Sequence, residues 1–172
     1  MFAVRCTRKL LLRGAPAILE APVPPTTVLG DWYANVLFTR PENLVVCISE
    51  RTLLPVVVTA KDIKHLPSRV ASAVRDMLFT VGIPASQVEA ELREMEFGYL
   101  AVTANRKVLG SLNEFMFQFE YAYHHLPSLT LHQRALRLAE MPCGAIEYAL
   151  PIEATRALFR AHDIVRTTSS AA

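Results

Sequence analysis

The sequence contains few cysteines, and their number and spacing exclude two classes of protein. There are three, Cys6, Cys47 and Cys143, and they lie far apart in the chain. An odd number at such spacing forms neither the disulfide framework of a small secreted domain nor a paired zinc-ligand motif. We therefore expect a protein of a reducing compartment, and the cytoplasm is its predicted location.

An excess of charge of one sign is absent as well. The chain has 18 Lys+Arg against 16 Asp+Glu, a formal net charge of +2. This balance argues against a protein that coats nucleic acid nonspecifically, although a local basic patch is compatible with it. No stretch approaches the roughly 18 uninterrupted apolar residues of a membrane helix, so no membrane partner is expected.

What the chain does contain is enough apolar sequence for one core. Hydrophobic residues make up 52% of the 172 residues and charged residues 20%, a composition too apolar for a disordered chain. Chains of roughly 100–200 residues usually fold as one domain. We therefore expect a single domain over residues 1–166, followed by a small, polar, frayed tail over residues 167–172.

The first 14 residues are basic and contain no acid, and two interpretations of them stay open. One is an organellar transit peptide, since transit peptides are rich in basic residues and poor in acidic ones. The segment lacks the serine enrichment of transit peptides, which favours an edge strand over residues 2–6 and a short helix whose leucines 10–12 dock on the core. The prolines within residues 15–27 then predict an ordered surface strap. The four cations are Arg5, Arg8, Lys9 and Arg13.

Hydrophobic patterning predicts a three-stranded antiparallel meander in the first half of the chain. Residues 32–39 alternate with a period of two, and residues 44–48 form a continuous β-branched and apolar run that is typical of a central strand. The third strand covers residues 53–59, and Pro55 favours an edge position because proline cannot donate to the ladder. Residues 97–103 alternate again and predict a further strand.

Helix caps and helical spacing predict about five helices. The strongest carries apolar and aromatic side chains on one face from Leu112 to Tyr123. The sum is an α+β fold, in which helices cover a small, mostly antiparallel sheet made of the meander plus one or two further strands. The helices are expected to begin at Ser68, Ser86, Ser111, Thr130 and Pro151, and the last to end at Ala161.

Four blocks of the sequence together resemble one known family. They are RCTRKLL (residues 5–11), GDWYAN (30–35), SERTLLPV (49–56) and NRKVLGSLNEF (105–115). The chain is similar to a bacterial family, a domain of unknown function, whose members share RCTxKLL, GDWYANxL, SERTLLPV and NRSVLGSMNDF-like blocks. Lys107 and Glu114 stand where that family usually has serine and aspartate. The resemblance implies a bacterial origin and a single domain, it suggests a plasmid or mobile-element accessory, and it supplies no reaction.

The block from Asn105 to Glu114 is the first candidate site. Unpaired N–H groups at a helix N-terminus, the Gly110–Ser111 pair, and the cations Arg106 and Lys107 are the ingredients of an anion or phosphate site. The block is no P-loop, because the GxxxxGK[ST] spacing is absent. The alternative is that its residues only cap a helix and that Arg106 is solvated.

A second candidate site joins the first strand to the meander. If those strands are neighbours, their polar residues converge at one end of the sheet and bind a phosphate or carboxylate through a bidentate arginine. The alternative is a set of exposed turn residues with weak ion pairs. In its sharpest form, the hypothesis places Arg5, Asn35, Arg51, Asn105 and Arg106 in one concave site. The further members are Thr7, Arg40 and Glu50.

Histidine and cysteine patterns predict no metal site and no cofactor. His124, His125 and His132 lack the HExxH or His-x-His spacing with a supporting carboxylate, so we expect imidazoles that interact with carbonyls at helix ends. Cys47 lies in the most apolar strand, which predicts a buried thiol without activation.

Three functions stay open. Phe117 and Tyr121 lie on the outer face of the aromatic helix and are candidates for a partner surface. Because no catalytic constellation is recognisable, the sequence favours a non-enzymatic intracellular module that binds a protein partner or itself. The alternatives are a nucleic-acid or phosphate-ligand protein and a toxin-like hydrolase. The former would use Arg5, Arg8, Lys9, Arg106 and Lys107, and the latter Glu50, Arg51, Asn105 and Arg106.

Overall fold

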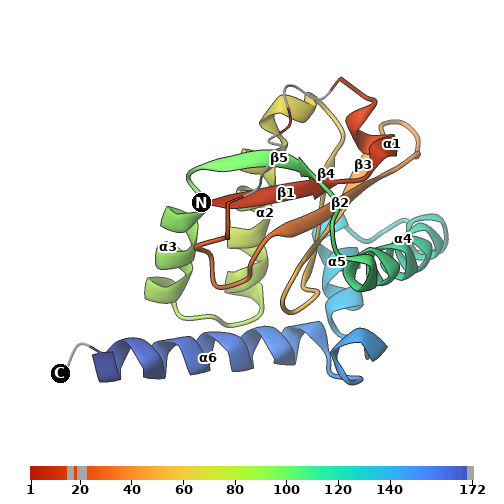
Figure 1. Ribbon diagram of the computed structural model, residues 1–172. Coiled ribbons are helices and arrows are strands. Elements are labelled where there is room, and N and C mark those ends of the chain that lie inside the picture. Colours follow the sequence, from red (N-terminus) through yellow and green to blue (C-terminus); the bar gives the residue numbers. More distant parts are fainter. Residues whose placement is uncertain (15–17, 19–22, 170–172) are drawn as a thin grey trace.

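The computed structural model describes residues 1–14, 18 and 23–169, and it has the α+β fold expected from the sequence. A mixed, open sheet of five strands has the order β4-β3-β2-β1-β5 (Figure 1). β2 with β3 and β3 with β4 are antiparallel, whereas β1 is parallel to both β2 and β5. The strands are β1 (Phe2–Cys6), β2 (Trp32–Leu37), β3 (Leu44–Ser49), β4 (Pro55–Thr59) and β5 (Gly98–Val102).

The predicted meander is confirmed by β2, β3 and β4. Every residue of β3 is buried, as its continuous apolar run indicated. β4 lies at the edge of the sheet and begins with Pro55, so the missing N–H of the proline costs the strand little.

The position of β1 corrects the sequence prediction. The strand covers the expected residues, but it lies inside the sheet between β2 and β5 and is not an edge strand. Phe2, Ala3 and Val4 are fully buried there. Its two neighbours are parallel, and parallel partners are joined by long connections that leave no local signal in the sequence.

The short helix after β1 has the expected place, but only part of its predicted packing is present. Leu10 is fully buried and Leu11 packs against the core, whereas Leu12 is exposed, so its predicted docking is wrong. Most of the predicted strap over residues 15–27 lies outside the described residues.

Helices cover both faces of the sheet. The face that carries Phe2 lies under α2, because a Cβ on Gly98 would meet Phe2 and Pro67 at 2.6 Å each. The opposite face carries Tyr33, whose hydroxyl accepts a hydrogen bond from the N–H of Asn105, the residue directly before α4. The helices are α1 (Arg8–Leu11), α2 (Leu66–Thr80), α3 (Ala85–Glu94), α4 (Arg106–His125), α5 (Leu131–Ala139) and α6 (Pro151–Ser169), with 3-10 turns η1 (Ile63–His65) and η2 (Gly144–Ile146).

Two predicted helix starts, at Ser68 and Ser86, are wrong. α2 begins at Leu66, directly after η1, and the Ser68 hydroxyl donates to the His65 carbonyl at 2.9 Å. α3 begins at Ala85 with Pro84 before it, so Ser86 lies inside the first turn and caps nothing. In both cases a proline near the helix start sets the backbone before the serine is reached.

The last two helices begin as the sequence predicts. Thr130 and Gln133 form a complete capping box at the start of α5. α6 begins at Pro151 but extends to Ser169, beyond the predicted end at Ala161, and residues 170–172 of the predicted tail lie outside the described residues. In Figure 1, α6 runs along the base of the molecule and continues past α3.

Candidate functional site

The sheet face under α4 holds an internal ion pair. The Nε of Arg5 donates to Oδ2 of Asp31 at 2.8 Å, and the N–H of Ala3 donates to Oδ1 of the same carboxylate at 2.9 Å. Asp31 is fully buried and the Arg5 side chain nearly so. Arg5 is thus largely occupied by a structural partner that sequence reasoning missed.

Two further polar contacts lie on this face. The Thr7 hydroxyl donates to Oδ1 of Asn35 at 2.6 Å, and the N–H of Asn105 donates to the Tyr33 hydroxyl at 3.0 Å. Burial raises the pKa of Tyr33, so its phenol stays protonated at neutral pH. Asn105 therefore connects the start of α4 to the sheet.

The expected helix start at Ser111, within the candidate anion site at residues 105–114, is wrong. α4 begins at Arg106, so Gly110 and Ser111 lie within the helix, where the Ser111 hydroxyl donates to the Lys107 carbonyl at 3.3 Å. Asn105 is the N-cap, and its Oδ1 accepts from the N–H groups of Lys107 at 3.0 Å and Val108 at 3.3 Å. Two donors that an anion would need are therefore already used.

The structure does not bring the predicted five-residue constellation into one site. Asn35 lies on the same sheet face as Arg5, and Asn105 lies above that face. Arg51 lies at the end of the sheet where β2 begins, and its Nη1 donates to the Val28 carbonyl at 3.0 Å. Arg106 is exposed at the start of α4.

The structure places the remaining candidates as follows. The Arg40 carbonyl accepts a hydrogen bond from the Tyr123 hydroxyl, and Glu50 follows β3 directly. His125 contacts the Tyr121 carbonyl through Nδ1 at 2.9 Å, as expected for a histidine at a helix end, whereas His132 contacts the Thr80 hydroxyl. Within the described ranges, no three His, Cys, Asp or Glu side chains gather in a way that could hold a metal ion.

The cysteines are thiols and not thiolates. Burial raises the pKa of Cys6 to about 12 and that of Cys143 to about 11. Cys47 is fully buried, and burial raises its pKa as well, which confirms the predicted core thiol. A thiolate is the nucleophilic form, so none of the three is an activated nucleophile.

A small groove between α1, the end of β2 and α4 is the first concave surface of interest. We call it the α1–α4 groove, and its cavity is about 340 Å³. Phe38 and Phe117 line it with exposed fractions of 53% and 68%, and Tyr121 lies one helical turn beyond Phe117 with 59%. The exposure predicted for Phe117 and Tyr121 is confirmed, and Phe38 is the member that sequence reasoning missed.

Two cations cover the ring of Phe38. The Nζ of Lys9 lies 4.4 Å and the Cζ of Arg13 5.8 Å from the ring centroid, within cation–π distance. In the part of the chain that the structure describes, neither cation forms an ion pair. The rim of the α1–α4 groove is therefore basic on the α1 side, with Glu120 on the α4 side.

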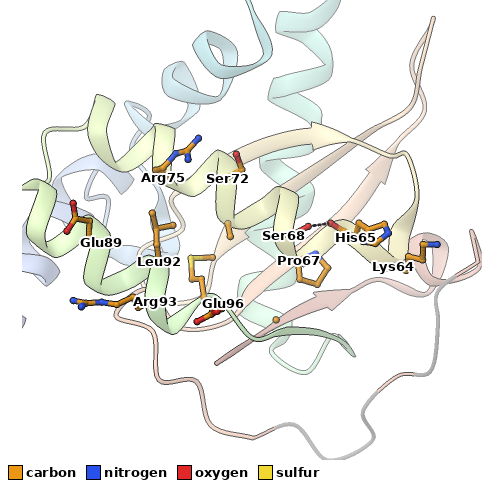
Figure 2. Close-up of a pocket in the computed structure, with 13 residues that line it drawn as sticks. Lys64, His65, Pro67, Ser68, Ser72, Arg75, Glu89, Leu92, Arg93 and Glu96 are labelled. Atoms are coloured by element: carbon orange, nitrogen blue, oxygen red, sulfur yellow. Dashed lines mark hydrogen bonds between the residues drawn. The ribbon is translucent and has the colours of Figure 1, made fainter.

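A larger groove of about 780 Å³ lies on the other side of the sheet, between α2, α3 and the start of β5 (Figure 2). We call it the α2–α3 groove. Its apolar lining comes from Pro67, Ala71, Leu92 and Met95. The charged residues of its rim are Lys64, His65, Arg75, Glu89, Arg93 and Glu96.

With this geometry described, a comparison with protein families gives a match. The family model Domain of unknown function (DUF6933) matches residues 3–154. The chain belongs to this family. The DUF6933 match includes both grooves and all five strands except the first residue of β1, while most of α6 lies beyond it. Among curated proteins no match is found. No helix within the described residues is long and apolar enough to cross a membrane.

Proposed function

We propose that this protein is a non-enzymatic, intracellular bacterial interaction module that binds an acidic segment of a protein partner in the α1–α4 groove. The observation that carries the proposal is a set of three aromatic side chains that are each more than half exposed: Phe38 and Phe117 line the cavity, and Tyr121 lies one helical turn beyond Phe117. Aromatic residues of this kind supply much of the binding energy of protein interfaces when a partner buries them.

The shape of the groove suits a side-chain anchor. Its volume of about 340 Å³ is at the lower end of the roughly 300–1,000 Å³ of ligand pockets. Met116 and Leu37 contribute apolar lining beside the two phenylalanines. A partner that inserts one large apolar side chain would shield this lining from water and gain from the hydrophobic effect.

The charge of the rim favours an acidic partner. Lys9 and Arg13 present their charges above Phe38 and form no ion pair within the described residues. Carboxylates on a partner would pair with both cations and steer the encounter. In a symmetric dimer the same surface faces itself, so these cations would approach their own copies; self-association is therefore supported less well.

The test is a selection from a displayed library of random, unstructured 12-residue peptides. We expect the enriched peptides to carry Asp or Glu beside an aromatic or aliphatic anchor. Phe117→Ala and Lys9→Glu should each weaken their binding at least tenfold. Phe97→Ala is the matched control, because Phe97 has the same exposed fraction of 68% and does not line the groove; this variant should bind like the unaltered protein.

Each alternative gives a different result. Sedimentation equilibrium that shows a dimer lost in Phe117→Ala assigns the surface to self-association. Binding of oligo-dT that weakens linearly with salt on logarithmic axes, and is lost when Arg8, Lys9, Arg106 and Lys107 are replaced, favours the nucleic-acid alternative. Enriched peptides that bind Phe117→Ala and the unaltered protein equally contradict the proposal.

A further inference from the structure

We propose that the α2–α3 groove is a second docking site, which takes an amphipathic helix of a protein partner with a basic flank. This site lies on the sheet face opposite α4 and is independent of the α1–α4 groove. The proposal is based on the walls of the groove, its apolar lining and the charges on the α3 side of its rim.

The walls of the groove are two helices. α2 and α3 are joined by a short connection over residues 81–84, so they form a helical hairpin, and β5 closes one end of the groove at Gly98. Figure 2 shows both helices along the groove with the labelled side chains between and beside them. A third helix fits such a hairpin because ridges of side chains on one helix pack into the grooves of its neighbours.

The lining suits the apolar stripe of such a helix. Met95 and Pro67 are buried at the base, while Ala71 and Leu92 are partly exposed. Helix-in-groove recognition uses apolar side chains at positions i, i+3 or i+4, and i+7 of the bound segment, which meet a lining of this kind.

The charges of the rim differ between the two walls. On the α2 side, Lys64 has Asp62 as its partner at 3.7 Å and Arg75 has Asp76 at 3.3 Å. On the α3 side, Glu89 and Glu96 form no ion pair within the described residues. Glu89 lies within α3, and Glu96 lies in the segment between the end of α3 at Glu94 and the start of β5, so both carboxylates line the groove.

Arg93 is a cation on the same side of the rim. It forms no ion pair in the ranges that the structure describes, and in Figure 2 its side chain is directed away from α2. The α3 wall therefore offers two carboxylates to an occupant. A bound helix with Lys or Arg on one flank would pair with these carboxylates while its apolar stripe covers Ala71 and Leu92.

The experiment is a selection from a displayed library of 18-residue helices against the full chain. The apolar stripe is kept at Leu, Ile, Val, Met or Phe, and the flanks are randomised among Lys, Glu, Gln and Ala. We expect enriched helices to carry Lys on one flank. In titrations, Glu89→Lys combined with Glu96→Lys should weaken their binding at least tenfold.

A matched variant controls for net charge. Glu140→Lys combined with Glu147→Lys makes the same change of charge at exposed positions outside the groove, and it should leave binding unchanged. Helices in which the flanking Lys are replaced by Glu should bind the Glu89→Lys, Glu96→Lys variant more tightly than the unaltered protein. Circular dichroism checks that both variants are folded.

Two outcomes would overturn the proposal. One is a selection without enrichment over the starting library. The other is a set of enriched helices that bind the groove variant and the control variant equally, which would show association with another surface. Binding in the α1–α4 groove should be unaffected by Glu89→Lys with Glu96→Lys, so the outcomes for the two docking sites are distinguishable.

Discussion

The two grooves lie on opposite faces of one sheet and differ in what their residues leave unpaired. The α1–α4 groove has aromatic walls and two cations, Lys9 and Arg13, that form no ion pair within the described residues. The α2–α3 groove has an aliphatic lining and two carboxylates, Glu89 and Glu96, that likewise form no ion pair within the described residues. A single small domain can thus present two different surfaces, because the sheet separates them and each has its own helices. The difference predicts two partners of opposite charge.

The largest expected effect is a loss of stability of the whole domain, which carries both grooves. Asp31→Ala leaves Arg5 buried without its carboxylate, and it removes the acceptor of the Ala3 N–H. Breaking one side of a buried pair costs about 3–5 kcal/mol. Urea unfolding should show a loss of this size, with both binding activities reduced in parallel. A loss below about 1 kcal/mol would show that the pair is replaceable by water.

The next effect is confined to the α2 side. Gly98→Ala places a Cβ 2.6 Å from both Phe2 and Pro67, so the strand and α2 must separate. Overpacking of this kind costs about 1–3 kcal/mol. We expect a lower midpoint in urea and weaker helix binding in the α2–α3 groove. Equal weakening at the α1–α4 groove would contradict the separation of the two surfaces.

A smaller effect is confined to the α4 side. Asn105→Ala removes the N-cap of α4 and should cost about 1 kcal/mol. Its matched control is Asn113→Ala, an exposed position within the same helix, where alanine has the higher helix propensity and no stability should be lost. Thermal unfolding of both variants measures the difference, and equal midpoints would contradict the capping role.

Phe117→Ala is expected to have the smallest effect on stability and a large effect on binding of the acidic peptides. Phe117→Ala and Phe97→Ala each shorten a side chain that is 68% exposed, so both should change the free energy of unfolding by less than about 0.5 kcal/mol. Only Phe117→Ala should lose the acidic peptides. A Phe117→Ala protein that unfolds markedly more easily would make Phe117 a packing residue and not a contact residue.

The sequence alone predicted burial and exposure correctly where the hydrophobic pattern is local and periodic. The apolar run of β3 predicted its complete burial, and the helical spacing of α4 separated buried Phe119 from exposed Phe117 and Tyr121. Side-chain direction follows from the period of 2 in a strand and 3.6 in a helix, so these predictions needed no knowledge of distant residues.

The predicted start of α4 was wrong because two capping residues competed. Ser111 has the sequence pattern of a capping box, yet the helix begins after Asn105. Asparagine is as good an N-cap as serine, and the additional bond from the Asn105 N–H to Tyr33 connects that start to the sheet. Because this bond joins residues far apart in the chain, the local pattern around Ser111 could not reveal it.

The sequence by itself determined the α+β class, the meander, the buried thiol of Cys47 and the outward direction of Phe117 and Tyr121. Only the tertiary structure decided that β1 lies inside the sheet, that Asp31 neutralises Arg5, and that Lys9 and Arg13 cover Phe38 beside α4. The physical reason is that periodic patterns record the burial of single side chains, whereas these contacts depend on parallel pairing of strands that are distant in the chain.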